Sequence, residues 1–484
     1  EIKSSEQLDT PCLGGYSDSK SLKLENNIEI EDFYDTSGYD RLIFCLNKLG
    51  GEDLKRQTAL IKNSLYATNI TGSESFKERE ILPVPAESFL EHSLDIAKNI
   101  EESAIHFDDS GITWIGNEYI PSLDRAQLQP LGYGLYSGIC GVALFLSALE
   151  HIEGKGRLKE TVLSSLKPLF LDIEDSPDTI VKETGIGGAM GLGSIVYSLT
   201  SISKFLEMPP VLEYAKKTAL LITDEVIEHD RHFDITGGLA GAILGLLKLY
   251  TVTGDKEILH RAEKCGDFLI ENRKESKSGY RSWATVENKL LAGFSHGAAG
   301  ITYSLLRLYS FLNKKTYIDA AAEAIAYENT LFREKFGNWL DLRMSEDKSE
   351  RFMISWCHGA PGIALGRIGG VCVLDNEDIR KDIDRGINTT INCPIVEKDH
   401  LCCGNMGRAD ILLTAGLKLN RPDLKEKALF KAGQIVALTK ETGGFKCGIE
   451  GFFDAGFFHG NSGIGYELLR LSHPEVIPSV LLFE

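Results

Sequence analysis

The sequence has few cysteines, no long apolar run and too few basic residues to balance its acidic ones. Cysteine supplies 10 of the 484 residues, which is too sparse for a disulfide-stapled scaffold. No uninterrupted run of about 18 apolar residues occurs, so we predict no membrane-spanning helix. The N-terminal stretch is polar and acidic and carries no signal-peptide pattern, so we expect none.

Acidic residues outnumber basic ones by 70 to 52, which gives a formal net charge of −18. This charge argues against nucleic acid or an anionic membrane as the main partner, because both repel an acidic surface. It tolerates a neutral or basic polypeptide substrate. The cysteines cluster from position 357 onward, which favours metal binding or catalysis in a reducing compartment over structural disulfides. We therefore expect a cytoplasmic protein.

The main feature of the chain is an internal repeat of Gly-x-x-Gly turns, most of which lead into a clearly apolar run. More amphipathic segments with charges at helical spacing lie between these runs, and strand-like alternation is rare. Each repeat therefore predicts a helical hairpin with a buried inner helix and a solvated outer helix. The first glycines of the seven turns are Gly138, Gly188, Gly238, Gly297, Gly359, Gly404 and Gly460.

Seven such hairpins can form an open solenoid or close into a ring. A solenoid carries polar capping repeats at its ends, but the last repeat, at residues 457–471, is nearly as apolar as the middle ones. We therefore predict an all-α fold, an α/α toroid (barrel) of seven helical hairpins, at residues 86–484. Residues 1–85 are too few and too irregular for an independent enzyme domain, and we expect a short, mostly helical segment there. A toroid would place all seven turns around one mouth.

The residues just before the turns are the candidates for chemistry. The fifth turn is preceded by Cys357 and the sixth by the pair Cys402 and Cys403, so three thiols could meet in a soft-metal site. Three thiolates would leave a fourth position on zinc for water or substrate. Asp234 and His296 precede the third and fourth turns and could act in acid–base chemistry at the same mouth.

Each of these residues also has a structural interpretation. The cysteines could be buried core residues, and Asp234 could be a helix cap, with Thr236 as a rival. A histidine before a glycine is often structural, and we interpret His459 in that way. We interpret Tyr136 as core or rim packing.

These motifs resemble those of the lanthionine synthetase cyclase (LanC-like) family. The resemblance covers residues 88–484 and is most specific at Ser355-Trp356-Cys357-His358-Gly359 and Leu401-Cys402-Cys403-Gly404. Within the family, the chain is similar to the C-terminal cyclase domain of class II bifunctional lanthipeptide synthetases (LanM type). Residues 1–85, with Asp53-Leu54-Lys55-Arg56-Gln57, resemble the tail of the preceding dehydratase domain, whose own catalytic region is absent from this sequence.

The resemblance implies an α/α toroid that binds zinc through Cys357, Cys402 and Cys403. The implied substrate is a dehydrated precursor peptide, in which a cysteine thiolate adds to dehydroalanine or dehydrobutyrine and forms a lanthionine or methyllanthionine ring. His296 and Asp234 are the implied acid and base, with His296 the better candidate for the enolate proton. Arg351 is a weaker candidate for stabilising the enolate.

Cys403 departs from the commoner family pattern, which has histidine at this place. A cysteine here resembles a subgroup typified by the prochlorosin synthetases, associated with broad substrate tolerance. Three thiolates make the zinc more electron-rich than two thiolates and an imidazole. Such a zinc should hold a substrate sulfur less tightly and leave it more nucleophilic, so we hypothesise a fast, less selective cyclase.

Three other interpretations stay open at this point. The chain could be a non-enzymatic LanC-like ring that binds zinc and a thiol such as glutathione. It could be another α/α toroid enzyme such as a glycosidase, although the turns offer few carboxylates beyond Asp234. It could also be a protein-binding solenoid with incidental cysteines. Zinc content and a cyclisation assay separate these possibilities.

Overall fold

A computed structural model of the chain describes residues 13–24, 28–51, 53, 54, 57, 58, 61, 81–107, 111–120, 125–344, 350–447 and 453–484. The chain divides into two compact units, Glu1–Tyr66 and Ala67–Glu484. Most of residues 53–66, part of the segment expected to be mostly helical, lie outside the described residues. The identity of residues 1–85 and their boundary with the rest stay predictions.

In the first unit, the described residues form a short hairpin and one helix. Strand β1 (Leu22–Lys23) pairs antiparallel with β2 (Glu29–Ile30), and α2 (Gly38–Lys48) follows. The hydroxyl of Ser37 caps α2 by accepting the backbone N–H of Asp40 at 3.0 Å. Large apolar side chains of α2 are nevertheless exposed, namely those of Tyr39, Leu42, Ile43, Phe44 and Leu46.

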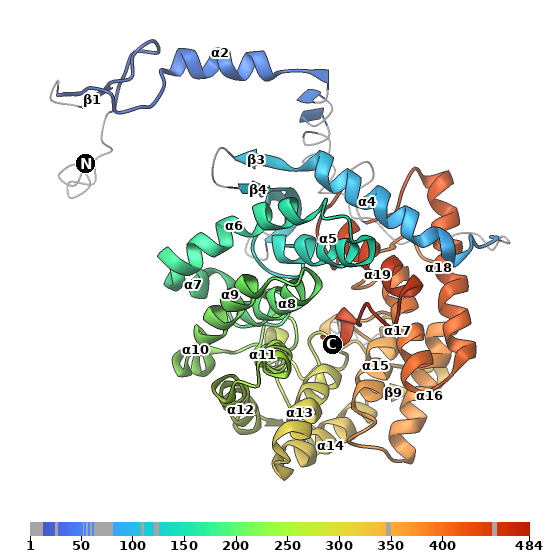
Figure 1. The fold of residues 1–484 in the computed structure, drawn as a ribbon. Helices are drawn as coiled ribbons and strands as arrows, with labels where there is room; N and C mark the ends of the chain where they lie inside the picture. Colours follow the sequence, from blue (N-terminus) through green and yellow to red (C-terminus); the bar gives the residue numbers. More distant parts are fainter. Residues whose placement is uncertain are drawn as a thin grey trace. The chain divides into compact units, whose positions relative to one another are not determined.

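Seven inner helices form a closed ring in the second unit (Figure 1). Each inner helix packs against the next one along the chain, and the last packs against the first, which closes the ring. The predicted α/α toroid is confirmed. The inner helices are α5 (Ile139–Glu153), α8 (Leu192–Phe205), α11 (Leu239–Thr253), α13 (Ala298–Leu312), α15 (Ala360–Gly370), α17 (Asn405–Lys418) and α19 (Asn461–Ser472).

An outer helix covers each inner helix. Six of the pairs are consecutive hairpins, whereas the seventh joins the two ends of the unit, because α19 packs against α4 (Phe89–Ser103). The serine hydroxyl of Ser93 on α4 donates to the carbonyl of Gly465 on α19 at 3.1 Å. The other outer helices are α6 (Lys159–Asp175), α9 (Pro209–Leu220), α12 (Lys256–Glu271), α14 (Lys315–Asn329), α16 (Glu377–Asn392) and α18 (Pro422–Thr442).

Short helices and two-stranded antiparallel hairpins fill the connections. They are α7 (Pro177–Thr184), α10 (Asp224–His229), β3 (Ile105–Phe107) with β4 (Gly111–Thr113), β5 (Ile115–Ile120) with β6 (Arg125–Pro130), β7 (Lys274–Glu275) with β8 (Arg281–Ser282), and β9 (Phe332–Arg333) with β10 (Asn338–Trp339). Among the described residues, no helix is both long and apolar enough to cross a membrane.

The second glycine of each turn is required by close backbone approach. A Cβ atom at Gly362 would overlap the carbonyl oxygen of Trp356, and one at Gly407 would overlap that of Leu401. The obstructing atoms are backbone, which yields less easily than a flexible side chain. The turns, which gather at the mouth of the ring, therefore bring the start of each inner helix directly against the residues that precede it.

Backbone hydrogen bonds join neighbouring turns around this mouth. The seventh turn is joined to the first, because the carbonyl of Tyr136 accepts the N–H groups of Phe457 and Phe458 at 3.1 and 2.8 Å. Equivalent bonds cross five more junctions: Tyr136 N to Ala189 O, Gly188 N to Ile235 O, Ile235 N to Ser295 O, Phe294 N to Cys357 O, and Cys402 N to Phe458 O. Within the described residues, no backbone bond joins the fifth turn to the sixth.

The chain's last residues fill the inside of the ring. Ile477, Leu481 and Leu482 are fully buried, and the indole N–H of Trp356 donates to the carbonyl of Leu481 at 3.2 Å. The hydroxyl of Tyr303 on α13 donates to the carbonyl of Leu482 at 2.9 Å. The interior of the ring is therefore a packed core.

Candidate metal and catalytic centre

Three thiols meet at the junction between the fifth and sixth turns. Cys357 is 7% exposed and Cys402 is 5% exposed, while Cys403 is half-buried. The side chains of the three cysteines lie within hydrogen-bonding distance of one another. The hydroxyl of Ser355 adds a contact of 3.1 Å to Sγ of Cys357. The junction without a backbone bond is thus the one at which the thiols meet.

The three thiols have unequal proton affinities. Hydrogen bonds from Cys357 and Cys402 to the sulfur of Cys403 hold the pKa of Cys403 well below its usual range. The same contacts raise the pKa of Cys402, together with burial. For Cys357, a hydrogen bond with Cys402 lowers the pKa, but the bond to Cys403 and burial outweigh it and raise the pKa to about 12. Negative charge therefore concentrates on Cys403.

The residues fit a zinc ion. Zinc prefers soft thiolate ligands in a tetrahedron, and Zn–S bonds of about 2.3 Å place two sulfur atoms about 3.8 Å apart. The protonation of the three thiols is linked through mutual hydrogen bonds, which places soft sulfur donors from two turns side by side. The nine described cysteines are all free, so none of these sulfurs is used in a disulfide.

Two histidines and a tyrosine lie on the other side of Cys403. Nε2 of His400 is 3.9 Å from Sγ of Cys403, and the rings of His400 and His459 are 4.5 Å apart. The ligand atoms of His400, Cys403 and His459 all lie within 4.8 Å of one another. The hydroxyl of Tyr136 is 2.8 Å from Nε2 of His459, and the ring of Tyr136 stacks on that of Phe458. Cys403 thus adjoins both the other two thiols and the imidazoles of His400 and His459.

Tyr136 also lies close to the thiols. Its pKa is raised well above the usual value by burial and by the charges of the three cysteines, with a hydrogen bond to Cys402. His400 is 3% exposed, and burial lowers its pKa. Its ring is therefore held in the neutral form, in which one nitrogen is free to act as a ligand.

An aspartate–histidine pair lies at the junction between the third and fourth turns. Oδ2 of Asp234 is 2.7 Å from Nδ1 of His296, and Oδ1 of Asp234 accepts the backbone N–H of Gly237 at 2.8 Å. The side chain of Asp234 is 2% exposed, whereas that of His296 is 27% exposed. The ring of His296 lies 5.7 Å from that of His358, the residue after Cys357. The carboxylate is fixed and the imidazole is the accessible member of the pair.

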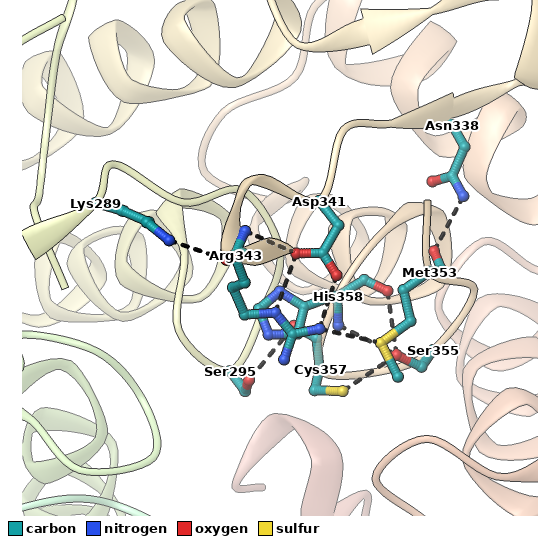
Figure 2. A network of polar contacts seen from close by, with 9 residues as sticks. All are labelled: Lys289, Ser295, Asn338, Asp341, Arg343, Met353, Ser355, Cys357 and His358. Carbon is teal, nitrogen blue, oxygen red and sulfur yellow. Dashed lines mark hydrogen bonds and ion pairs between the residues drawn. The ribbon is translucent and has the colours of Figure 1, made fainter. Parts of the chain in front are cut away.

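A cation completes the site beside Cys357 (Figure 2). Asp341 accepts two hydrogen bonds from the guanidinium of Arg343, at 3.0 and 2.7 Å, and Lys289 donates to the carbonyl of Arg343 at 2.9 Å. Burial lowers the pKa of Arg343, but Asp341 and the thiols Cys357 and Cys402 outweigh it and raise the pKa. Arg343 therefore stays charged next to the thiols.

His358 is neutral at this position. Burial, followed by the charges of Arg343 and His296, lowers the pKa of His358 to about 3. Nε2 of His358 is buried and has no hydrogen-bond partner among the described residues. The neutral ring lines the space between Arg343 and His296 without competing for a proton.

The structure brings the sequence-predicted residues into one mouth. Cys357, Cys402 and Cys403 adjoin one another, and Asp234 and His296 form a pair; their roles as ligands and catalysts stay predictions. The alternative of Asp234 as a cap for the following turn also has support, since it accepts the N–H of Gly237.

Sequence reasoning missed three participants. Asp341 and Arg343 lie in a connection with no Gly-x-x-Gly signal, and His400 lies one residue outside the positions just before its turn. The only available signal for His400 was its place two residues before a cysteine pair, because side chains at that spacing can bind the same metal ion. His459 and Tyr136 were interpreted as structural, and both adjoin the candidate ligands.

The fold and the site define a class: a closed ring of seven helix pairs with a thiol cluster at its mouth. Residues 129–482 match the family model described as Lanthionine synthetase C-like protein. The chain belongs to this family, as the sequence motifs predicted.

Individual relatives agree with this assignment. The chain is 22% identical to the lacticin 481/lactococcin biosynthesis protein LcnDR2 of Lactococcus lactis subsp. lactis, over 97% of this chain and 50% of that protein. It therefore spans about half the length of this curated relative. The solved structure of nisin cyclase matches with a TM-score of 0.53 and 19% identity, over 80% of this chain and 93% of that one. This structural likeness shows the fold.

A shorter match joins 22% of the chain to 26% of the unsaturated glucuronyl hydrolase of Formosa agariphila, at 30% identity. This match is too short to show a family.

Proposed function

We propose that the chain is a lanthipeptide cyclase, which adds cysteine thiolates of a dehydrated precursor peptide to dehydroalanine or dehydrobutyrine in the same peptide. The observation that carries this proposal is the convergence at one mouth of three free thiols and an aspartate–histidine pair. Membership of the lanthionine synthetase C-like family supports it. The products are lanthionine and methyllanthionine thioether rings.

Cys357, Cys402 and Cys403 would hold a zinc ion, which when bound supplies a positive charge that converts a substrate thiol into a thiolate. Ser355 holds Cys357 in place through its hydroxyl. Backbone bonds from Phe294 and Ser295 to the carbonyl of Cys357, at 3.1 and 3.2 Å, fix the fifth turn against the fourth. The protein thereby keeps the thiols and the imidazole of His296 in a fixed relation.

The substrate thiol first gives up its S–H proton. The thiolate then forms a C–S bond at the β-carbon of the dehydro residue and moves the π electrons onto the carbonyl as an enolate. The α-carbon finally takes up one proton, so the overall addition neither gains nor loses protons. We assign the donation of that proton to His296, because its ring is accessible. Asp234 orients the ring through Nδ1, and its two oxygens already accept hydrogen bonds from His296 and Gly237. The accessible Nε2 then faces the substrate.

Arg343 is placed to stabilise negative charge during the addition. Its guanidinium is held by Asp341 on one side and lies near enough to Cys357 and Cys402 for their charges to interact. A cation held in a fixed orientation costs no reorganisation when charge develops on the enolate oxygen. The bidentate contact with Asp341 supplies that orientation.

The decisive experiment is incubation of the chain with a dehydrated precursor peptide, followed by thiol alkylation and mass spectrometry. Ring formation is an isomerisation, so the peptide mass stays constant while one alkylatable thiol disappears for each ring. The C357A and C402A variants should leave the thiols free. If the unsubstituted, zinc-loaded chain leaves the number of alkylatable peptide thiols unchanged, the proposal is wrong. Binding of glutathione without cyclisation would favour the non-enzymatic interpretation instead.

We also propose that the first unit packs against a preceding dehydratase domain. The exposed apolar side chains of α2, Leu42, Ile43 and Leu46 among them, form a surface that the described part of this unit leaves uncovered. The Lactococcus relative is twice as long as the part that aligns with this chain. Co-purification of this chain with the N-terminal half of such a protein, lost on changing Leu42 and Leu46 to Asp, would test the contact.

A cytoplasmic location fits the same chemistry. All nine described cysteines are free, and the site needs its thiols reduced. Fractionation of producing cells followed by detection of the chain tests this placement.

A further inference from the structure

Among the described residues, the junction between the fifth and sixth turns lacks the backbone hydrogen bond that joins the other neighbouring turns. A side chain spans this junction instead. We propose that Arg408 is a positioning residue, whose guanidinium ties the two cysteine-bearing turns together and keeps their thiols side by side. The inference rests on the zinc assignment in the proposed function. It adds a residue that would act through the backbone of the turns and not as a ligand.

The guanidinium of Arg408 bonds to both turns at once. Arg408 lies near the start of α17 and is 5% exposed. Its Nη1 donates to the carbonyl oxygen of Ile354, before the fifth turn, at 3.0 Å, and its Nη2 donates to Oδ1 of Asn405, in the sixth turn, at 2.5 Å. The planar guanidinium holds its N–H groups in a rigid fork, so these two bonds fix Ile354 relative to Asn405.

Ser355 carries this constraint from Ile354 to the thiol of the fifth turn (Figure 2). It follows Ile354 in the chain and is 1% exposed. Its backbone N–H donates to the carbonyl of His358 at 3.1 Å, and its hydroxyl contacts Sγ of Cys357 at 3.1 Å. A shift of Ile354 would therefore move Ser355, and with it the sulfur of Cys357.

The sixth turn is the fixed side of this bridge. Oδ1 of Asn405 accepts the N–H of Val396 at 3.0 Å in addition to the bond from Arg408. The amide nitrogen of Asn405 donates to the carbonyl of Val396 at 2.8 Å and to Oδ1 of Asp399 at 2.7 Å. Asp399 in turn holds the backbone N–H of Lys446 at 2.9 Å. The amide thus uses its full hydrogen-bonding capacity and is held from several sides.

The charge of Arg408 suits this place as well. Both of its hydrogen bonds go to neutral oxygens. Burial lowers the pKa of Arg408, and the charges of Cys393, Cys403 and Asp399 oppose that shift. A guanidinium stays charged inside proteins, so a buried cation interacts with the thiol cluster. Three thiolates around a zinc ion carry a net negative charge, which such a cation offsets.

Zinc affinity, measured on the full chain by competition with a chromophoric chelator, tests the bridge without relying on activity. R408M keeps most of the side chain's length but removes the charge and both hydrogen bonds. It should bind zinc roughly 10–100-fold more weakly, as expected when a residue that supports metal ligands is lost. R408K keeps the charge but not the fork, so its affinity should fall to a similar degree. Full affinity in R408K would mean that charge alone matters and would overturn the positioning role.

Amide hydrogen exchange in the metal-free protein separates a loosened junction from a weakened fold. R408M should speed exchange at residues 352–358 and leave residues 234–240 unchanged. A uniform increase over both segments, or none at residues 352–358, would overturn the inference. If R408M does not fold, R408K serves for the same measurement, because it keeps the buried charge.

S93A is the control for stability. It removes the buried hydroxyl that joins α4 to α19 through the carbonyl of Gly465. It should lower the urea midpoint of unfolding and leave zinc affinity unchanged. A loss of zinc affinity in S93A equal to that in R408M would show that affinity merely follows stability, and the positioning role would be wrong.

The outcomes also separate this inference from the cyclase proposal. If R408M weakens zinc binding as expected but the unsubstituted chain forms no rings, the cyclase proposal fails and the role of Arg408 stands. If the unsubstituted chain forms rings and R408M binds zinc equally well, the role of Arg408 is wrong and the cyclase proposal stands.

Discussion

Nδ1 of His296 lies 2.7 Å from Oδ2 of Asp234, and the other oxygen of that carboxylate holds the N–H of Gly237 at 2.8 Å. The carboxylate is thereby fixed at the start of one turn while it orients the imidazole of the next. A pair of residues 62 positions apart acts as one unit because their turns are neighbours in the ring.

The D234N substitution tests this pair. It keeps the shape of the side chain but removes the charge that orients His296, so the cyclisation rate should fall roughly 10²–10⁴-fold. The rate is measured by the loss of alkylatable thiol from a dehydrated peptide. Zinc content should stay the same, because Asp234 does not belong to the thiol cluster. An unchanged rate at equal zinc content would contradict the assignment.

Removal of the metal should loosen one junction of the ring. The fifth and sixth turns share no backbone hydrogen bond among the described residues, so a zinc held by Cys357, Cys402 and Cys403 would tie them together. Chelation should therefore speed amide hydrogen exchange at residues 355–362 and 402–407. The loss of stability should reach about 4 kcal/mol where free zinc had exceeded its Kd 1,000-fold.

The third and fourth turns provide an internal control for that experiment. They are joined by backbone bonds from Ile235 and Thr236 to the carbonyl of Ser295, at 3.1 and 3.3 Å. Their exchange rates should not change on chelation. A uniform increase around the whole mouth would mean that the metal does not act at one junction.

Replacing Cys403 by His tests the meaning of the third thiol. The change would make the site less electron-rich, so a substrate thiolate should be held more tightly and react more slowly. We expect a lower cyclisation rate and a narrower range of accepted peptides, compared over several dehydrated substrates. Equal rates for C403H and the unsubstituted chain on all of them would refute the hypothesis. Zinc content of both proteins should be measured first.

The Gly-x-x-Gly turns should tolerate no side chain at the second glycine. In G362A, the new Cβ would overlap the carbonyl oxygen of Trp356, and we expect the free energy of unfolding to fall by about 1–3 kcal/mol or more. Denaturant unfolding measures this loss. G132A is the matched control, since a Cβ at Gly132 meets no atom within 4 Å. Similar losses in both variants would show that the clash is not the cause.

Much of the fold is predictable because its causes are local. The Gly-x-x-Gly turns occur where a Cβ would meet backbone of the same turn, as at Gly362 and Gly407, so the sequence must repeat glycine there. Helical periodicity identifies which segments are buried on all sides, such as α11, and which are amphipathic, such as α12. The same local positions, just before the turns, identified Cys357, Cys402, Cys403, Asp234 and His296.

The sequence by itself determined the all-α class, the repeat and the thiols at two turns, because spacing along the chain sets each of these. Tertiary structure decided which turns are neighbours. Tyr136 and His459 meet although they lie 323 positions apart, because closure of the ring joins the first turn to the seventh. The same closure pairs α4 with α19 and brings His459 next to Cys403. Arg343 reaches Cys357 only through a connection whose path the repeat does not specify.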